Sequence, residues 1–185
     1  MRILGAVLAG GRSSRFGSDK ALAEWNGRTL LEGAIAALRP QCDDICVVGR
    51  SDAPVAAVAD WPQPDCGPLG GMAGALRYAL SHDFDQMLSI PVDVVGLPPD
   101  LRQRLSPAPA YLLNLPVAGL WRTAALPALE TILTGRGSRS VRNFADACGA
   151  RGVTLPSELS NINTLADLER LRAFNEHSHL LSEEP

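Results

Sequence analysis

Residues 8–20 read LAGGRSSRFGSDK and follow directly on the apolar run of residues 3–9. A short apolar run bounded by glycines is typical of a buried strand. The paired glycines leave room for backbone amides to approach a ligand, because no Cβ stands in the way. Arg15 and Lys20 add positive charge, and charge-assisted hydrogen bonds offset the desolvation of a triphosphate. The stretch therefore predicts a buried first strand that opens into an anion-binding loop.

This loop matches neither of the two common phosphate-binding motifs. A Walker A loop needs Lys and then Ser or Thr directly after its last glycine, whereas here Gly17 is followed by Ser18-Asp19-Lys20. The loop also lacks the G-x-G-x-x-G pattern of dinucleotide-binding folds. An ordinary solvated loop stays open as the alternative interpretation.

The apolar run also resembles a short signal peptide, since it follows Arg2. It is at the low limit of length for such a peptide, and Arg12 and Arg15 follow it at once, so a buried strand explains it better. The four cysteines form no C-x-x-C pair, which argues against a zinc site and a disulfide framework. We therefore expect a cytoplasmic protein. No stretch approaches the ~18 apolar residues of a membrane span, so we expect no membrane partner.

The composition is that of one compact domain. The chain has 185 residues, of which 46% are hydrophobic and 20% charged, and its formal net charge is -3. This apolar fraction excludes wholesale disorder. The near-balanced charge argues against a nucleic-acid binder, because such proteins usually carry a basic face. We expect a single domain over residues 1–175 and a frayed tail over residues 176–185.

Apolar strands alternate with amphipathic helices along the rest of the chain. We expect strands at 45–48, 55–59, 87–90, 110–115, 116–121 and 153–155. We expect helices at 30–38, 69–80, about 124–134 and about 139–148. Residues 98–100 open a further short helix, and a final helix starts at 164. Thr29 and Glu32 have the T-x-x-E spacing of a capping box at the start of the first helix. The alternation predicts an α/β fold, a three-layer, Rossmann-like and mostly parallel sheet with helices on both faces. Ligands of such folds gather at the carboxyl ends of the strands.

Asp93 directly follows the strand expected at 87–90, in the sequence Pro91-Val92-Asp93. Magnesium is commonly held by one or two carboxylates together with water and phosphate oxygens. Asp93 is therefore a candidate ligand for Mg²⁺ beside a bound triphosphate. A turn or helix-capping aspartate is the alternative, and it is the interpretation that we favour for Asp100.

Four segments of the chain carry a resemblance to one family. They are L-A-G-G-x-S-x-R-x-G-x-D-K at 8–20, G-P-L-x-G-M at 67–72, P-x-D followed by P-P-D-L at 91–101, and the asparagines at 161–163. The chain resembles the molybdenum cofactor guanylyltransferases over about residues 3–174. These are nucleotidyltransferases with a glycosyltransferase-A-like fold, of the nucleotide-diphospho-sugar transferase type. The chain departs from the family at Val92, where cysteine is usual, and at Val95, where proline is usual, and neither change removes a metal ligand.

The resemblance implies transfer of GMP from GTP to the terminal phosphate of molybdopterin or its molybdenum-bearing form, with release of pyrophosphate. It implies that Asp93 binds Mg²⁺ and that Lys20 and Arg15 contact phosphates, which makes these three the expected catalytic residues. The nucleotide-binding residues that it implies are Leu8, Ala9, Gly10, Gly11, Lys20, Asp60 and Asp93.

Asp60 lies seven residues before Gly67, at the distance where the family has an aspartate that contacts the guanine nucleotide. A carboxylate can accept hydrogen bonds from both the ring N–H and the exocyclic amine of guanine. Asp65 is closer to the glycine motif and competes for this role, although we favour Asp60. The alternative is that either carboxylate only solubilises a proline-rich loop.

Three later features point to the acceptor. By resemblance, residues 116–121 form a strand near the acceptor pocket. By resemblance, Asn161 or Asn163 contacts the pterin, and the alternative is that Asn163 or Thr164 caps the last helix. The basic run of Arg136, Arg139 and Arg142 suits the phosphate of the acceptor, and a solvated helix face explains it equally well. The expected partners are thus GTP and molybdopterin, with hand-over to or from other proteins of the cofactor pathway as an open possibility.

Two other functions stay open. A CTP-dependent molybdopterin cytidylyltransferase or a sugar-1-phosphate nucleotidyltransferase is the nearer one. Relatives that use CTP tend to have L-A-A-G where Gly10-Gly11 follow Ala9 here, and sugar-nucleotide enzymes are usually longer. A non-catalytic nucleotide-binding module is the alternative of another class. Lys20 and Asp93 argue against it, because binding alone does not need both.

Overall fold

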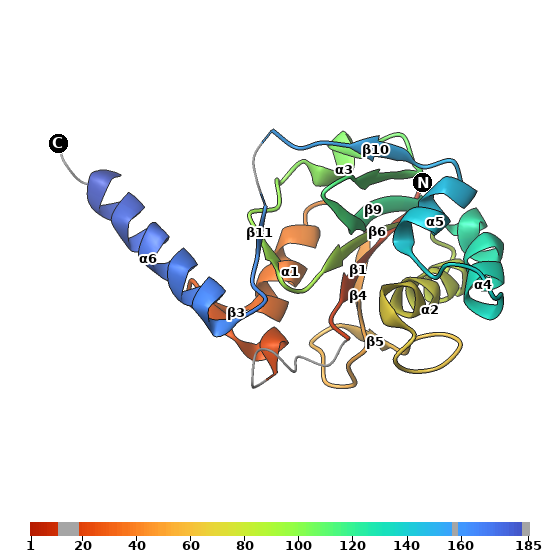
Figure 1. The fold of residues 1–185 in the computed structure, drawn as a ribbon, viewed down its shortest axis with the longest axis horizontal. Helices are drawn as coiled ribbons and strands as arrows, with labels where there is room; N and C mark the ends of the chain where they lie inside the picture. The colour runs from red at the N-terminus through yellow and green to blue at the C-terminus, as the bar shows by residue number, and fades with distance from the viewer. Residues whose placement is uncertain (11–18, 157–158, 183–185) are drawn as a thin grey trace.

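The structure, a computed structural model, describes residues 1–10, 19–156 and 159–182. Within these ranges a seven-stranded sheet forms the middle layer, in the strand order β10-β8-β9-β6-β1-β4-β5. Its strands are β1 (Ile3–Leu8), β4 (Asp44–Val48), β5 (Ala56–Val58), β6 (Gln86–Pro91), β8 (Ala110–Leu112), β9 (Leu115–Arg122) and β10 (Arg151–Val153). Figure 1 shows the sheet between helices on its two sides.

The strands at the centre of the sheet run in one direction. β1 pairs in parallel with β4 and with β6, and β4 pairs in parallel with β5. β9 runs antiparallel to its neighbours β6 and β8, and β10 is parallel to β8. The carboxyl ends of β1, β4, β5 and β6 therefore lie at one edge of the sheet, together with the amino end of β9.

Two layers of helices cover the sheet, because successive residues of a strand face opposite sides. The helices are α1 (Leu30–Leu38), α2 (Gly67–Ser81), α3 (Leu101–Arg104), α4 (Leu126–Thr134), α5 (Val141–Ala147) and α6 (Leu165–Ser182). Ile3 and Val7 of β1 belong to one apolar core, which α1 and α3 complete. Leu4 and Ala6 belong to the other core, which α2, α4 and α5 complete. The predicted three-layer α/β fold with a mostly parallel sheet is confirmed.

The capping box predicted at the start of α1 is present. The backbone N–H of Glu32 donates to Thr29 Oγ1 at 3.1 Å, and the backbone N–H of Thr29 donates to Glu32 Oε2 at 2.8 Å. The two bonds satisfy amide groups that have no partner within the helix. They fix the position at which the chain enters α1.

Several short elements were not predicted from the sequence. They are the single-turn helices η1 (Lys20–Leu22) and η2 (Thr123–Ala125), and the two-residue strands β2 (Glu24–Trp25), β3 (Arg28–Thr29), β7 (Val94–Val95) and β11 (Ser160–Asn161). β2 and β3 form a hairpin about Asn26-Gly27, whose φ angles of 50° and 72° suit a tight turn. β7 pairs antiparallel with β11. The last strand of the main sheet, expected at residues 153–155, is found earlier as β10.

Helix α6 leads away from the sheet, and Figure 1 shows its first turns beside β3. In the first half of this helix, Arg172 donates through Nη2 to the backbone oxygen of Glu24 at 2.6 Å. The chain is helical through Ser182, beyond the start of the tail that the sequence predicts to be frayed, at residue 176. The division into a domain over 1–175 and a tail over 176–185 stays a prediction. None of the described helices is long and apolar enough to cross a membrane.

Candidate active site

A cavity of about 700 Å³ opens at the edge of the sheet where β1, β4 and β6 end. This is the edge at which ligands of parallel α/β sheets gather. The predicted site residues that line it are Leu8, Ala9, Gly10, Lys20, Asp60, Asp65, Asp93, Asn161 and Asn163. Segments far apart in the sequence thus supply one site, as the prediction requires.

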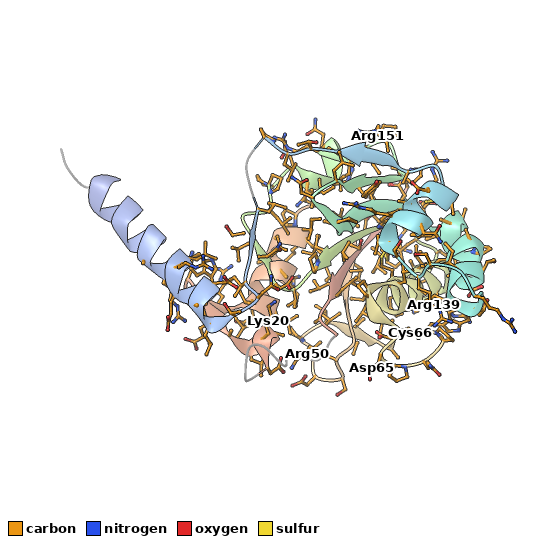
Figure 2. All side chains as sticks on the ribbon, in the orientation of Figure 1. Lys20, Arg50, Asp65, Cys66, Arg139 and Arg151 are labelled. Carbon is orange, nitrogen blue, oxygen red and sulfur yellow. The ribbon has the colours of Figure 1, made fainter. Side chains whose placement is uncertain are left out.

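The structure places one predicted site residue away from this cavity and does not describe two others. Gly11 and Arg15 lie outside the ranges that the structure describes. Arg139 lies in the exposed loop between α4 and α5, where its Nη2 is 3.5 Å from the backbone oxygen of Gly135. It does not line the cavity, and Figure 2 shows it well apart from Lys20. Its position offers no support for the expected contact with the acceptor.

Lys20 lies between two other predicted site residues. Its Nζ donates to Asp93 Oδ2 at 2.7 Å and to Asn163 Oδ1 at 3.0 Å. The Lys20 side chain is 12% exposed and that of Asp93 is 27% exposed, so the pair is partly shielded from water. Partial burial strengthens such a contact, because the local dielectric constant is lower than in bulk water.

Local structure explains how these three residues meet. Lys20 is the first residue of η1, and Asp93 follows the end of β6. The backbone N–H of Ile162 donates to the backbone carbonyl oxygen of Asp93 at 2.9 Å, next to the pairing of β7 with β11. This short pairing brings Asn161 and Asn163 to the end of β6. Sequence periodicity does not detect it, since two-residue strands have no measurable period.

Hydrogen bonds at the start of α6 show which of Asn163 and Thr164 caps this helix. Thr164 Oγ1 accepts from the backbone N–H of Asp167 at 3.1 Å, and Asp167 Oδ2 accepts from the backbone N–H of Thr164 at 2.8 Å. The helix-capping interpretation is therefore right for Thr164. The side chain of Asn163 instead turns to Lys20.

Asp60 comes after β5 and faces the glycines at the base of the cavity. A Cβ added to Gly10 or Gly71 would lie 3.9 or 3.7 Å from Asp60 Oδ1. Burial raises the pKa of the Asp60 carboxyl, and the negative charge of Asp65 raises it further. Asp65 also lines the cavity but is exposed, so Asp60 is the more enclosed of the two candidate base contacts.

A close approach of α2 to the end of β5 places Asp60. A Cβ added to Gly74 of α2 would lie 2.1 Å from the carbonyl oxygen of Ala59, so only glycine fits there. The backbone N–H of Trp61 also donates to the carbonyl oxygen of Gly70 at 3.0 Å. Asp60 is thus held between two backbone contacts with one helix.

The cavity suits a metal ion that arrives with a ligand rather than a metal ion enclosed by protein. Within the described residues no group of three or more His, Cys, Asp or Glu side chains is arranged to hold a metal. Asp93 supplies one carboxylate at the cavity. A single carboxylate with phosphate oxygens and water is a donor set typical of Mg²⁺, so the residues present fit that ion.

The apolar side of the cavity comes from the strand that the sequence predicts at 116–121 and that, by resemblance, lies near the acceptor pocket. Leu115 and Val117, from the amino end of β9, line it beside Val92. They reach this edge because β9 runs antiparallel to β6. The resemblance implied the neighbourhood of this strand, and its antiparallel direction shows which of its residues reach the cavity.

Comparisons with known proteins show the family to which the chain is related. Residues 5–149 match the family described as MobA-like NTP transferase domain. A molybdenum cofactor guanylyltransferase of Acidiphilium cryptum is 35% identical to the chain over 181 residues, which cover 90% of this chain and 92% of the relative. The match extends over nearly the full length of both proteins.

Solved structures share the fold at low sequence identity. Molybdopterin-guanine dinucleotide biosynthesis protein A from Archaeoglobus fulgidus superposes with a TM-score of 0.73 at 19% identity, covering 94% of this chain and 99% of that one. A Mycobacterium tuberculosis protein in complex with manganese superposes with a TM-score of 0.63 at 18% identity, covering 92% and 98%. The predicted type of α/β fold is confirmed by these likenesses.

Proposed function

The chain belongs to the family of MobA-like NTP transferase domains, and from this premise we propose that it transfers GMP from GTP to the terminal phosphate of molybdopterin or its molybdenum-bearing form, releasing pyrophosphate. The name of the Acidiphilium cryptum relative supports the choice of substrates. The observation that carries the proposal is the meeting of Lys20 and Asp93, 2.7 Å apart, in a cavity at the carboxyl ends of the strands.

The nucleotide lies, in this proposal, with its phosphates against the end of β1. Leu8, Ala9 and Gly10 line the cavity there, and backbone amides at glycine can approach phosphate oxygens closely. Lys20 supplies the cation, and Gly11 and Arg15 are further predicted contacts. The base lies toward Asp60, whose carboxylate accepts from the two N–H groups on the guanine edge.

Asp93 is the residue that would hold a divalent cation, which we take to be Mg²⁺. Such an ion, when bound, neutralises charge on the phosphates and on the leaving pyrophosphate. Lys20 already contacts Asp93, so its ammonium is placed to exchange a carboxylate partner for a phosphate partner. The manganese complex of the Mycobacterium tuberculosis protein supports divalent-cation use by proteins of this fold.

The transfer step needs little proton chemistry. An oxygen of the acceptor phosphate attacks the α-phosphorus of GTP and forms the new P–O bond. The bond from the α-phosphorus to the bridging oxygen breaks, and pyrophosphate leaves with the electron pair. Because the acceptor is already an anion, the site needs no strong general base. The work of the protein is to align two anions and screen their repulsion.

The acceptor lies on the opposite side of Lys20 from the nucleotide base in this proposal. Asn161 and Asn163 line that part of the cavity with the apolar side chains of Leu115 and Val117. Amide groups beside an apolar wall suit a flat heterocycle with polar edges. Hand-over of the acceptor by another protein and the cytoplasmic location stay predictions.

Pyrophosphate release tests the proposal. The purified protein should release pyrophosphate when given GTP, molybdopterin and Mg²⁺ together, and should release none when the acceptor is left out. Parallel reactions with CTP, ATP and UTP separate guanylyl transfer from its nearest alternatives. Equal or greater release with CTP would overturn the choice of GTP, and nucleotide binding without release would favour a non-catalytic module.

A further inference from the structure

The two residues that follow β4 contact the chain at Gly10 and at Asp19. Gly49 has a φ of +83°, and a Cβ there would lie 2.4 Å from the Cα of Gly10. Arg50, the next residue, donates through Nη1 to Asp19 Oδ1 at 2.8 Å and Oδ2 at 2.7 Å. The turn after β4 is thus joined both to the end of β1 and to the residue before Lys20.

Arg50 is an enclosed cation with few partners. Its side chain is 10% exposed, and its Nη2 also donates to Asp52 Oδ1 at 3.0 Å. Its Nε is buried and has no hydrogen-bond partner among the described residues. The hydrogen bond to Asp19 is the main cause that raises the pKa of Arg50. Loss of Asp19 would leave a nearly buried charge with one exposed carboxylate as its partner.

Asp19 connects this cation to Lys20. Asp19 Oδ1, which accepts from Arg50, also accepts from the backbone N–H of Ala21 at 3.1 Å. That bond caps η1, whose first residue is Lys20. The Asp19 carboxylate therefore sets the start of η1, and with it the direction in which the Lys20 side chain leaves the backbone.

We propose that Arg50 is a positioning residue for Lys20, acting through the Asp19 carboxylate. Arg50 does not line the cavity, so it is not placed to touch the nucleotide itself. Figure 2 shows Arg50 and Lys20 on the same side of the molecule. A fixed carboxylate gives Lys20 one direction, toward Asp93 and Asn163. The consequence for nucleotide binding rests on the proposed function, but the positioning of Lys20 does not.

The sequence provides a direct probe of this positioning. Lys20 is the only lysine in the 185 residues, so an amine-acylating reagent reports on its Nζ, and peptide mapping separates it from the terminal amine. Lys20 should react slowly in the parent protein, because its Nζ is paired and little exposed. The experiment compares acylation rates in the parent, Arg50→Met, Asp19→Asn and Asp52→Asn proteins without any nucleotide.

The expected result is specific to one of the two carboxylates that Arg50 contacts. Acylation of Lys20 should be about tenfold faster in Arg50→Met and Asp19→Asn, the change expected for loss of one charge-assisted hydrogen bond. Asn at position 19 can still accept from the backbone N–H of Ala21, so the variant should fold. It lacks the charge through which Arg50 holds the cap, and therefore the Lys20 side chain, in one direction. Asp52→Asn, which alters only the exposed partner of Arg50, should react like the parent. A parent-like rate in folded Asp19→Asn or Arg50→Met protein would overturn the proposal.

Nucleotide binding gives a second readout that a merely structural role would not produce. Arg50→Met should weaken GTP binding about tenfold in the parent and should have no further effect in a Lys20→Met background. If the losses of GTP affinity in the two single variants add up in the double variant, Arg50 does not act through Lys20 and the proposal is overturned. If Lys20→Met alone leaves GTP binding unchanged, the phosphate role of Lys20 in the proposed function fails, and the acylation rates still decide the role of Arg50.

Discussion

The Lys20 ammonium lies 2.7 Å from the Asp93 carboxylate, although the two are predicted to bind different parts of a metal–nucleotide complex. Each charge is partly buried, and each would be destabilised without a partner. The ion pair therefore holds both side chains in place before a ligand arrives. In the proposed function, a nucleotide and its cation would replace this ion pair with two contacts to the ligand, one from Lys20 to a phosphate and one from Asp93 to the cation.

The first prediction concerns Asp93. Asp93→Ala should lower the rate of pyrophosphate release by about a hundredfold or more, because it removes the carboxylate proposed to hold the divalent cation that neutralises charge on the phosphates. The thermal midpoint should fall only modestly, since the substitution removes no core volume and Lys20, which loses its charged partner, keeps its hydrogen bond to Asn163. Asp100→Ala is the matched control, because Asp100 pairs with Arg104 away from the cavity. An Asp93→Ala protein that works at the parent rate would refute the metal assignment.

The second prediction concerns nucleotide affinity. Lys20→Met should weaken GTP binding by about tenfold to a hundredfold, the range expected for one charge-assisted hydrogen bond. Titration calorimetry measures the dissociation constant directly. Arg39→Met is the control for loss of one positive charge, because Arg39 lies exposed at the end of α1 and does not line the cavity. Equal losses in the two variants would mean that net charge, and not a contact of Lys20, attracts the nucleotide.

The third prediction separates Asp60 from Asp65. Asp60→Asn should reduce the preference for GTP over ATP by about tenfold or more, because an amide replaces a charged acceptor at the guanine edge. Asp65→Asn, tested beside it, should have the smaller effect. The reverse order, measured as the ratio of the two dissociation constants, would assign the base contact to Asp65.

The raised pKa of Asp60 makes a fourth prediction about pH. Burial and the charge of Asp65 disfavour the ionised carboxyl, so the folded state holds its proton to a higher pH than the unfolded state does. The protonated carboxyl therefore contributes its whole stabilising free energy below the ordinary pKa of aspartate. That contribution is lost as the pH rises through the raised pKa of Asp60 in the folded protein. At neutral pH, Asp60→Asn should therefore unfold at the same temperature as the parent or higher.

Two measurements on Asp60→Asn check this prediction: its unfolding temperature and the pH dependence of its GTP affinity. GTP affinity of the parent should fall as the solution is acidified through the raised pKa of Asp60, because recognition needs the ionised form. Asp60→Asn should lose this part of the pH dependence. A variant that unfolds at a lower temperature at neutral pH would show that the carboxylate stabilises the fold instead.

The fifth prediction concerns the helix that places Asp60. Gly74→Ala should lower the free energy of unfolding by about 1–3 kcal/mol, because the new methyl would meet the Ala59 carbonyl. Gly33→Ala in α1 is the matched control, since a Cβ there meets nothing within 4 Å. It should raise the free energy of unfolding by ~0.5–1 kcal/mol, as alanine does in a helix interior. Urea denaturation of both variants measures the difference.

Much of the fold was predictable because its central strands are buried on both faces. Apolar runs mark β1, β4 and β6 clearly, and the T-x-x-E pattern marks the start of α1. The direction of β9 was not predictable, because strand direction depends on partners and not on the local pattern. That direction brings Leu115 and Val117 to the cavity.

The site residues were predicted from motifs, but their mutual contacts were not. Lys20 and Asn163 are 143 residues apart in the chain, and their hydrogen bond depends on the two-residue pairing of β7 with β11. The role of Arg50 was missed for a similar reason, since its partner Asp19 is 31 residues away. A lone arginine after a strand gives no sign of being enclosed.

The central claim is that one cavity binds a nucleoside triphosphate and its divalent cation through Lys20 and Asp93. Crystals grown with a non-hydrolysable GTP analogue and Mn²⁺ test it most directly, because the anomalous signal of manganese locates the ion. The account predicts an anomalous peak coordinated by the Asp93 carboxylate and phosphate oxygens in contact with Lys20 Nζ. A manganese peak and a nucleotide bound together at any other surface, with the Lys20–Asp93 ion pair intact, would contradict it.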